Sequence, residues 1–206
     1  MSQISVDKNA KYYDISTETL FPSFICSCLI DVNPKNVAQE IYRFKNEHPS
    51  VEVSNEGGYH SPYFSISDDN SYKKYSFLTD VIKVTHQFVD DLLFNYLNVD
   101  KQIKEIEFWT LINKAYDYNI LHLHPHTDLV GVYYASVPEN CGNLVVVRSD
   151  SFNTVNLGVD CRKEVQAEEG RLYVFPATLF HYVMANLSNE DRISIAFNFT
   201  LENSTS

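Results

Sequence analysis

Histidines that alternate along one short segment are the first residues of this sequence that could do chemistry. Residues 121–128 read LHLHPHTD, so His122, His124 and His126 recur at every second position. In an extended chain, side chains two residues apart point to the same face. A lone histidine is most often a hydrogen-bonded polar residue, whereas several imidazoles on one face are typical of a metal site. The spacing therefore favours a metal-binding segment.

Two ligand pairs compete within this segment. His122 and His124 form an H-x-H pair, whereas His126 and Asp128 form an H-x-D pair. Either pair would place two metal ligands on one face of an extended chain. The spacing alone leaves both pairs open and does not say which metal is bound.

His181 is a further candidate ligand, and it lies within the apolar segment 175–183, which reads FPATLFHYV. A buried imidazole needs a partner, and a metal ion is one such partner. Taken alone, His181 could equally be a core histidine that is satisfied by hydrogen bonds. It belongs to both candidate ligand sets.

The last long alternating segment begins with an arginine. One face of this segment carries Arg192, Ser194, Ala196 and Asn198, and the other face is apolar. If Arg192 points inward it needs an anion, and a guanidinium fork beside a hydroxyl suits a carboxylate. A surface arginine that pairs with Glu190 or Asp191 is the alternative.

Two helices come before these segments. The pattern predicts a strand over residues 19–30 and a helix that begins at Asn33-Pro34 and ends near Glu47. Residues 54–61 are expected to form a loop around two glycines. A long amphipathic helix is predicted from about residue 72 to 97, with Tyr96 on its buried face.

From residue 104 onwards the sequence pattern is typical of strands. Strands are predicted at 105–112, 120–126, 130–136, 144–148, 172–175, 180–184 and 193–201. Helices segregated against an antiparallel sheet give an α+β domain. We expect one domain over residues 1–206, with a helical part at 1–103 and a β core at 104–201.

Charge and composition narrow the class of protein. The formal net charge of -11 argues against duplex nucleic acid and anionic membranes as partners. The N-terminus lacks a secretion signal, and no apolar run approaches the length of a membrane span. The four cysteines form no C-x-x-C pair, and Cys26 and Cys28 are expected to be small core residues. We therefore expect a cytoplasmic protein.

These stretches resemble a known family, the small 2-oxoglutarate/Fe(II)-dependent oxygenases of bacteria and phages. The resemblance covers most of the chain, and its most specific parts are the H-x-H pair and the spacing from the distal histidine to R-I-S. It rests on His122-x-His124-Pro125, Gly131-x-x-Tyr134, Phe175-Pro176 to His181, Arg192-Ile-Ser194 to Asn198, and upstream Phe21-Pro22, the 54–59 loop and residues 109–113. Two departures are Val130, where the family has serine, and the additional His126-x-Asp128.

The resemblance implies a fold, a chemistry and a set of roles. The fold would be a double-stranded β-helix, a cupin-like jelly roll, with two N-terminal helices on one sheet. Fe(II) would bind His122, His124 and His181, or else His181 with His126 and Asp128. Of the residues assigned to 2-oxoglutarate, Arg192 and Ser194 would hold its far carboxylate, and Tyr134 and Asn113 would add hydrogen bonds.

The reaction implied is the hydroxylation of an unidentified small molecule or side chain, with O₂ consumed and 2-oxoglutarate decarboxylated to succinate. The Gly57-Gly58 loop could form part of a lid. The sheet edges of such a fold permit a homodimer. If a phage encodes the protein, we expect it in the host cytoplasm.

Two other functions fit some of the same residues. A three-histidine iron dioxygenase would oxidise a small thiol or similar substrate without 2-oxoglutarate. A non-catalytic barrel module would bind zinc through a closed set of four ligands, which His122, His124, His126 and His181 could supply.

Overall fold

The computed structural model describes residues 23–68, 70–148 and 161–204. The helical elements are α1 (Pro34–Glu47), the 3₁₀ turn η1 (Ser71–Lys74), α2 (Ser76–Asp91) and the π-helical turn η2 (Leu92–Tyr96). The strands are β1 (Cys26–Leu29), β2 (Asn55–Glu56), β3 (Tyr59–His60), β4 (Phe64–Ser65), β5 (Lys101–Asn113), β6 (Tyr118–His122), β7 (Leu129–Ser136), β8 (Leu144–Val147), β9 (Arg162–Val165), β10 (Arg171–Pro176), β11 (Phe180–Val183) and β12 (Arg192–Asn203).

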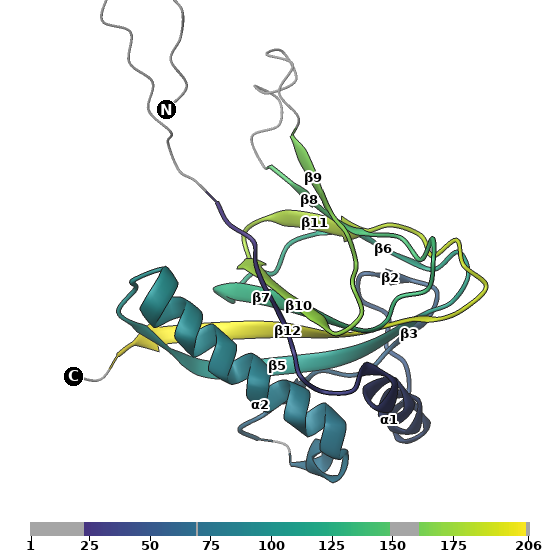
Figure 1. Cartoon of the computed structure of the whole chain (residues 1–206), viewed down its shortest axis with the longest axis horizontal. Coiled ribbons are helices and arrows are strands. Elements are labelled where there is room, and N and C mark those ends of the chain that lie inside the picture. The colour runs from purple at the N-terminus through teal and green to yellow at the C-terminus, as the bar shows by residue number, and fades with distance from the viewer. Residues whose placement is uncertain (1–22, 69, 149–160, 205–206) are drawn as a thin grey trace, which may run out of the picture.

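Two antiparallel sheets face each other, and both helices cover the outer face of the larger one (Figure 1). The larger sheet has the order β1-β10-β7-β12-β5-β3, with β4 also paired to β5. The smaller sheet has the order β2-β6-β11-β8-β9. This arrangement confirms the predicted double-stranded β-helix with two N-terminal helices on one sheet. None of the helices within the described residues is long and apolar enough to cross a membrane.

Helix α1 forms as its sequence predicts. The side chain of Asn33 caps it by accepting hydrogen bonds from the backbone N–H groups of Lys35 (3.0 Å) and Asn36 (3.4 Å). Proline follows the cap at the first helical position, where its missing N–H costs nothing. The apolar stripe of Val37, Ile41 and Phe44 is fully buried against the larger sheet.

The predicted long second helix is divided into three parts. A 3₁₀ turn comes first, α2 follows, and the π-helical turn η2 ends the segment. A π turn holds more residues than an α turn, so residues within and beyond it are rotated relative to the buried stripe. Tyr96, predicted on the buried face, is consequently 78% exposed.

The predicted loop at 54–61 contains two short strands instead. Strand β2 joins the smaller sheet through β6, and β3 joins the larger sheet through β5. Between them, Gly57 and Gly58 adopt φ of +75° and +66°, which only glycine adopts at little cost. This turn therefore bridges the two sheets at one end of the sandwich.

Strand β12 lies in the middle of the larger sheet, between β5 and β7. Its apolar residues, Ile193 to Phe199 at alternate positions, are buried in the core beneath the helices. Arg192, Ser194 and Ala196 instead line a cavity between the sheets. The alternation predicted from sequence is confirmed.

Other predicted strands need correction. The predicted strand at 19–30 is β1 alone within the described part, and residues 19–22, including Phe21 and Pro22, lie outside the described residues. Strand β9 was not predicted, because its Arg162–Val165 sequence is mostly polar. The strand predicted over 120–126 ends at His122.

Because the His181 and Arg192 strands follow each other in the sequence, antiparallel pairing between them is the expectation, but the structure shows otherwise. Strand β11 pairs with β6 and β8 in the smaller sheet, whereas β12 is in the larger sheet. The connecting segment crosses from one sheet to the other, and Asn186 fixes it by donating to Asn113 O (2.9 Å) and Glu190 O (2.8 Å). His181 and Arg192 therefore belong to opposite layers of the sandwich.

Candidate functional site

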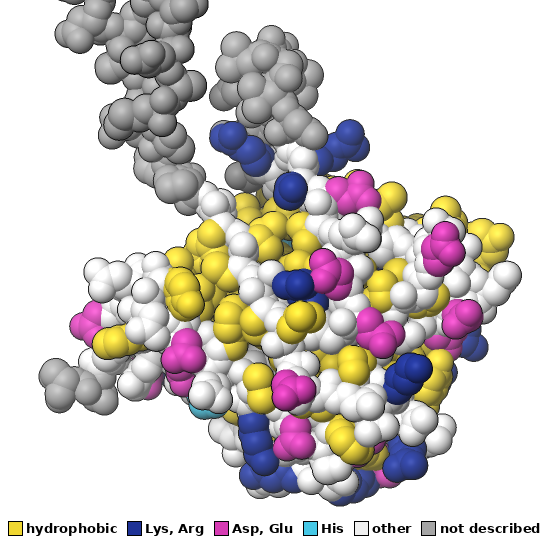
Figure 2. Space-filling view, in the orientation of Figure 1, with side chains coloured by type: hydrophobic (Ala, Val, Ile, Leu, Met, Phe, Trp, Pro, Cys, Tyr) yellow, Lys and Arg dark blue, Asp and Glu magenta, His cyan; other side chains and the backbone are white. Residues whose placement is uncertain are grey.

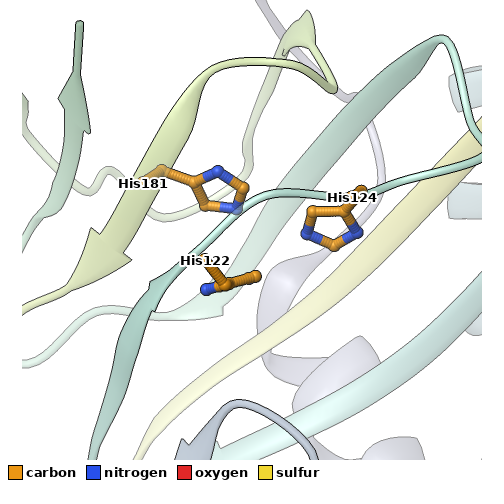
Figure 3. Close-up of side chains that lie close together, drawn as sticks. All are labelled: His122, His124 and His181. Atoms are coloured by element: carbon orange, nitrogen blue, oxygen red, sulfur yellow. The ribbon is translucent and has the colours of Figure 1, made fainter. Parts of the chain in front are cut away.

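Three histidines meet between the sheets. His122 ends β6, His124 lies just beyond that strand, and His181 is paired with His122 across the β6–β11 ladder. Their rings point toward one another, and each imidazole offers one nitrogen within 4.8 Å of the others (Figure 3). The ring centroids are separated by 4.3 Å for His122–His181, 5.0 Å for His122–His124 and 5.1 Å for His124–His181.

Hydrogen bonds determine which nitrogen of each ring is available. Nδ1 of His122 faces Ile120 O at 2.7 Å, and Nδ1 of His181 faces Leu179 O at 2.9 Å. Nδ1 of His124 faces the side-chain oxygen of Asn198 at 2.8 Å. A carbonyl oxygen can only accept, so each Nδ1 carries the proton and each Nε2 keeps a lone pair. Such outer partners are typical of metal-binding histidines.

The amide of Asn198 is itself oriented by a carboxylate. Its nitrogen donates to Oε2 of Glu107 at 3.2 Å, which leaves its oxygen facing His124. Asn198 and Glu107 are directly opposite each other in the β12–β5 ladder. A carboxylate therefore acts on His124 through one intervening amide.

Burial keeps these imidazoles neutral. Burial, reinforced by repulsion from His122, lowers the pKa of His181 to about 3 and that of His124 to about 4. Burial also lowers the pKa of His122 below its ordinary value. Neutral imidazole is the form that binds a metal ion, so the cluster is ready for a cation at neutral pH.

The alternative pair does not join this cluster. His126 is exposed and adopts φ of +74°, so a turn interrupts the alternation after His124. Asp128 is also exposed, and its carboxylate accepts a hydrogen bond from Leu201 N at 2.8 Å. Of the two pairs in the 122–128 segment, the structure brings only His122 and His124 to His181.

A buried arginine lies in the same cavity as the histidines. Arg192 is 1% exposed, which excludes the alternative of a surface ion pair. Its Nη1 donates to Met184 O at 2.9 Å and closely to Cys141 O. Gly142 permits this carbonyl cage, because a Cβ there would lie 2.5 Å from Met184 O. Burial lowers the pKa of Arg192 from its ordinary value.

Three donors at this end of the cavity have no acceptor. Nη2 of Arg192, the hydroxyl of Tyr134 and the amide nitrogen of Asn113 are buried without a hydrogen-bond partner in the described chain. All three residues, together with Ser194, line the cavity that contains the histidines. An unsatisfied buried donor costs about 1–3 kcal/mol, so this cluster of donors fits an anionic ligand. A dicarboxylate that also reaches the metal would satisfy both ends.

Sequence reasoning missed two members of the site, Trp109 and Glu107. Trp109 stacks between His60 and His124, with centroid distances of 5.8 Å to each ring. Residues 107, 109, 111 and 113 alternate along β5, and this period of two was the signal that could have assigned them to the site-facing side.

Comparisons with solved structures show the class of fold. The chain is similar to a prolyl-4-hydroxylase from Pseudomonas putida, with TM-score 0.56, 16% identity, and coverage of 85% of this chain and 91% of that one. It is also similar to a Trichoplax adhaerens prolyl hydroxylase in complex with a hypoxia inducible factor peptide, with TM-score 0.61, 11% identity and coverage of 85% and 83%. HygX from Streptomyces hygroscopicus, with nickel and 2-oxoglutarate bound, gives TM-score 0.54, 14% identity and coverage of 86% and 83%. These proteins share the double-stranded β-helix fold with this chain.

A family match is more specific. Residues 107–198 match the family described as "Putative 2OG-Fe(II) oxygenase", a span that includes all three clustered histidines and Arg192. No curated protein matches the chain. The family match and the structural neighbours support the 2-oxoglutarate/Fe(II) oxygenase family. Together with the histidine cluster, they support Fe(II) and 2-oxoglutarate as the cofactors.

Proposed function

We propose that this protein is an oxygenase that uses Fe(II), 2-oxoglutarate and O₂ to hydroxylate a small molecule or a protein side chain. The observation that carries the proposal is one cavity with two complementary ends. Three imidazoles with one nitrogen each within 4.8 Å of the others lie at one end, and an unpaired buried guanidinium nitrogen lies at the other. A metal ion and a dicarboxylate are the ligands that such ends require.

Each residue has a role in this proposal. His122, His124 and His181 hold Fe(II) and leave the remaining coordination positions for other ligands. Arg192 and Ser194 hold the far carboxylate of 2-oxoglutarate, and Tyr134 donates its buried hydroxyl to the same ligand. Asn113 donates its free amide hydrogen there as well.

The bound iron and 2-oxoglutarate supply the oxidising chemistry, in which O₂ is consumed and 2-oxoglutarate becomes succinate and CO₂. The protein's own residues position the ligands and exclude water. Val130, Leu144 and Phe175 line the cavity and are nearly fully buried, so much of the wall around the ligands is apolar. Low polarity around the site also strengthens the pairing between Arg192 and a carboxylate.

We further propose a single domain over residues 1–206, a cytoplasmic location, a homodimer through sheet edges and a lid at Gly57-Gly58. The net charge of -11 continues to disfavour duplex nucleic acid and membranes as partners. On the face seen in Figure 2, the Asp and Glu side chains are dispersed and alternate with neutral, Lys and Arg side chains.

The proposal is tested by asking whether O₂ uptake and succinate formation depend on both Fe(II) and 2-oxoglutarate. The protein is loaded anaerobically with Fe(II) and then given O₂, with and without 2-oxoglutarate, while O₂ uptake and succinate are measured. We expect slow succinate formation even without a primary substrate, and none when either Fe(II) or 2-oxoglutarate is omitted. Absence of succinate from iron-loaded protein that binds 2-oxoglutarate would contradict the proposal.

One observation favours a second candidate, a three-histidine iron dioxygenase that does not use 2-oxoglutarate. The cluster consists of three imidazoles and, among the described residues, includes no carboxylate. In that case Arg192 would hold the carboxylate of the substrate itself. Uptake of O₂ with a small thiol and without 2-oxoglutarate would identify this function. The zinc module is less well supported, because His126, its fourth ligand, lies outside the cluster.

A further inference from the structure

A second cavity opens beside the histidines, away from Arg192. We call it the Glu107 groove, and its lining includes Tyr63, Glu107, Trp109, Ile120, Pro125 and Asn198. His122, His124 and Trp109 line both this groove and the Arg192 cavity, so they form the wall between them.

The β5–β12 ladder shows how far apart the two ends lie. Arg192 is opposite Asn113, and six residues further along β12, Asn198 is opposite Glu107. Six residues of strand span roughly 20 Å. The positive end of the site and Glu107 are therefore well separated, with the histidine cluster between them.

The groove carries one carboxylate and no basic side chain. Among its described lining residues, Glu107 is the only Asp or Glu, and no lysine or arginine is present. Oε2 of Glu107 accepts from Asn198, whereas Oε1 accepts no hydrogen bond from the described residues. One carboxylate oxygen therefore remains available to a ligand.

Aromatic rings beside Glu107 favour the same kind of ligand. The rings of Tyr63 and Trp109 have centroids 4.7 Å apart, and Tyr63 is 43% exposed at the outer wall. Burial and the nearby Glu107 both raise the pKa of Tyr63, so the two side chains are within electrostatic reach. Aromatic rings attract cations electrostatically. Ile120 and Pro125 provide apolar surface for a carbon chain.

We propose that the Glu107 groove binds the primary substrate and selects one with a protonated amine or guanidinium on a short carbon chain. The cation pairs with Glu107 and lies near Tyr63, and the adjoining carbons lie along Trp109 toward His122 and His124. Anionic substrates are rejected by the carboxylate. This inference rests on the proposed function, in which the carbon to be oxidised must come close to the iron.

Trp109 makes the binding measurable, because it is the single tryptophan of the chain and lines the groove. Hexylamine, hexanol and hexanoate, which are matched in length, are titrated anaerobically into the protein with Fe(II) and 2-oxoglutarate, while tryptophan fluorescence is recorded. We expect hexylammonium to bind about tenfold more tightly than hexanol, and hexanoate to bind most weakly. A parallel titration of metal-free protein should give the same order and excludes direct coordination of the amine to iron.

The variant Glu107→Gln removes the charge but keeps an oxygen that can accept from Asn198. It should abolish the preference for hexylammonium over hexanol. The matched control is Glu105→Gln, which changes a carboxylate on the same face of β5 that accepts from Ser65 and does not line the groove. This control should keep the preference.

Three outcomes would overturn the inference: equal binding of amine and alcohol, an unchanged preference in Glu107→Gln, or no fluorescence response to any probe. Failure of this inference can be told apart from failure of the proposed function. A preference for the amine that depends on Glu107, in a protein that never forms succinate, would support the substrate-binding groove and contradict the oxygenase activity. Succinate formation with no preference for the amine would support the oxygenase activity and contradict the role of the groove.

Discussion

Arg192 and Asn113 lie directly opposite each other in the β12–β5 ladder, and each has a buried donor with no partner among the described residues. Cross-strand neighbours are close enough for two such donors to bind one ligand. Tyr134 and Ser194 line the same cavity, so this end of the site can donate several hydrogen bonds to one carboxylate.

Arg192→Ala should weaken 2-oxoglutarate binding about 100-fold, because charge-assisted hydrogen bonds to a buried carboxylate are lost. Calorimetric titration of anaerobic, Fe(II)-loaded protein measures this affinity. Iron binding should be retained, because the hydrogen bonds of Arg192 go to Cys141 O and Met184 O and not to the histidines. Arg171→Ala, which changes a surface arginine paired with Glu168, is the control. Unchanged affinity in Arg192→Ala would remove Arg192 from the site.

His181→Ala should abolish stoichiometric metal binding, because two imidazoles on one short segment cannot complete the site. His126→Ala should leave metal binding unchanged, because the turn at φ +74° holds His126 outside the cluster. Metal content after anaerobic loading and desalting distinguishes the two. Loss of metal in His126→Ala with retention in His124→Ala would instead establish the H-x-D pair.

Asn198→Leu should weaken metal binding by about 10–100-fold, because loss of an outer hydrogen bond frees the ring of His124 to rotate and change tautomer. Competition with a chelator measures the affinity. Asn198→Asp keeps an acceptor for Nδ1 of His124 and should retain more of that affinity than Asn198→Leu. If both variants bind metal as tightly as the wild type, Asn198 does not position His124.

Gly142→Ala should lower 2-oxoglutarate affinity and stability together. A Cβ there would lie 2.5 Å from Met184 O, one of the carbonyls that hold Arg192. Gly170→Ala is a matched control, since Gly170 has φ of +81° against +82° at Gly142 but its Cβ would meet only Pro34, at 3.4 Å. Both variants should lose about 1–2 kcal/mol from backbone strain. Only Gly142→Ala should also lose ligand affinity; equal affinities would show that the carbonyl cage is unimportant.

Acid should destabilise the metal-free protein through the buried histidines. Their folded pKa values, about 3 for His181 and about 4 for His124, lie below the unfolded value of about 6.5. The unfolded chain therefore binds protons first, so this stability is complete above about pH 6.5 and is lost progressively as pH falls toward about 4. Each pH unit within that window should cost about 1.4 kcal/mol per histidine.

Urea unfolding of metal-free protein at about pH 7.5 and about pH 5 measures this loss. His181→Gln should lose less stability between the two pH values than the wild type does. The exposed His126→Gln should behave as the wild type. An identical pH dependence in His181→Gln would show that His181 is not buried as a neutral ring.

Local patterns were sufficient for several parts of this protein. The Asn33-Pro34 signal and the stripe of Val37, Ile41 and Phe44 predicted helix α1, because capping and helical periodicity act within a few residues. Strict alternation from Arg192 to Asn198 predicted which side chains share a face, whereas the structure decided that Arg192 points into the sandwich. The spacing of His122 and His124 predicted a shared face for the same reason.

Contacts between distant segments decided the rest. Three features changed the face or the sheet to which the following side chains belong. They are the turn after His124, the π-helical turn before β5 and the crossing of the chain between β11 and β12. None of these has a period that a short window of sequence displays. The hydrogen-bond partners of the histidine Nδ1 atoms, and the absence of a partner for Arg192 Nη2 among the described residues, likewise depend on how other segments pack around them. Sequence by itself determined which residue types could bind a metal and a carboxylate, whereas packing of the two sheets decided which of them meet.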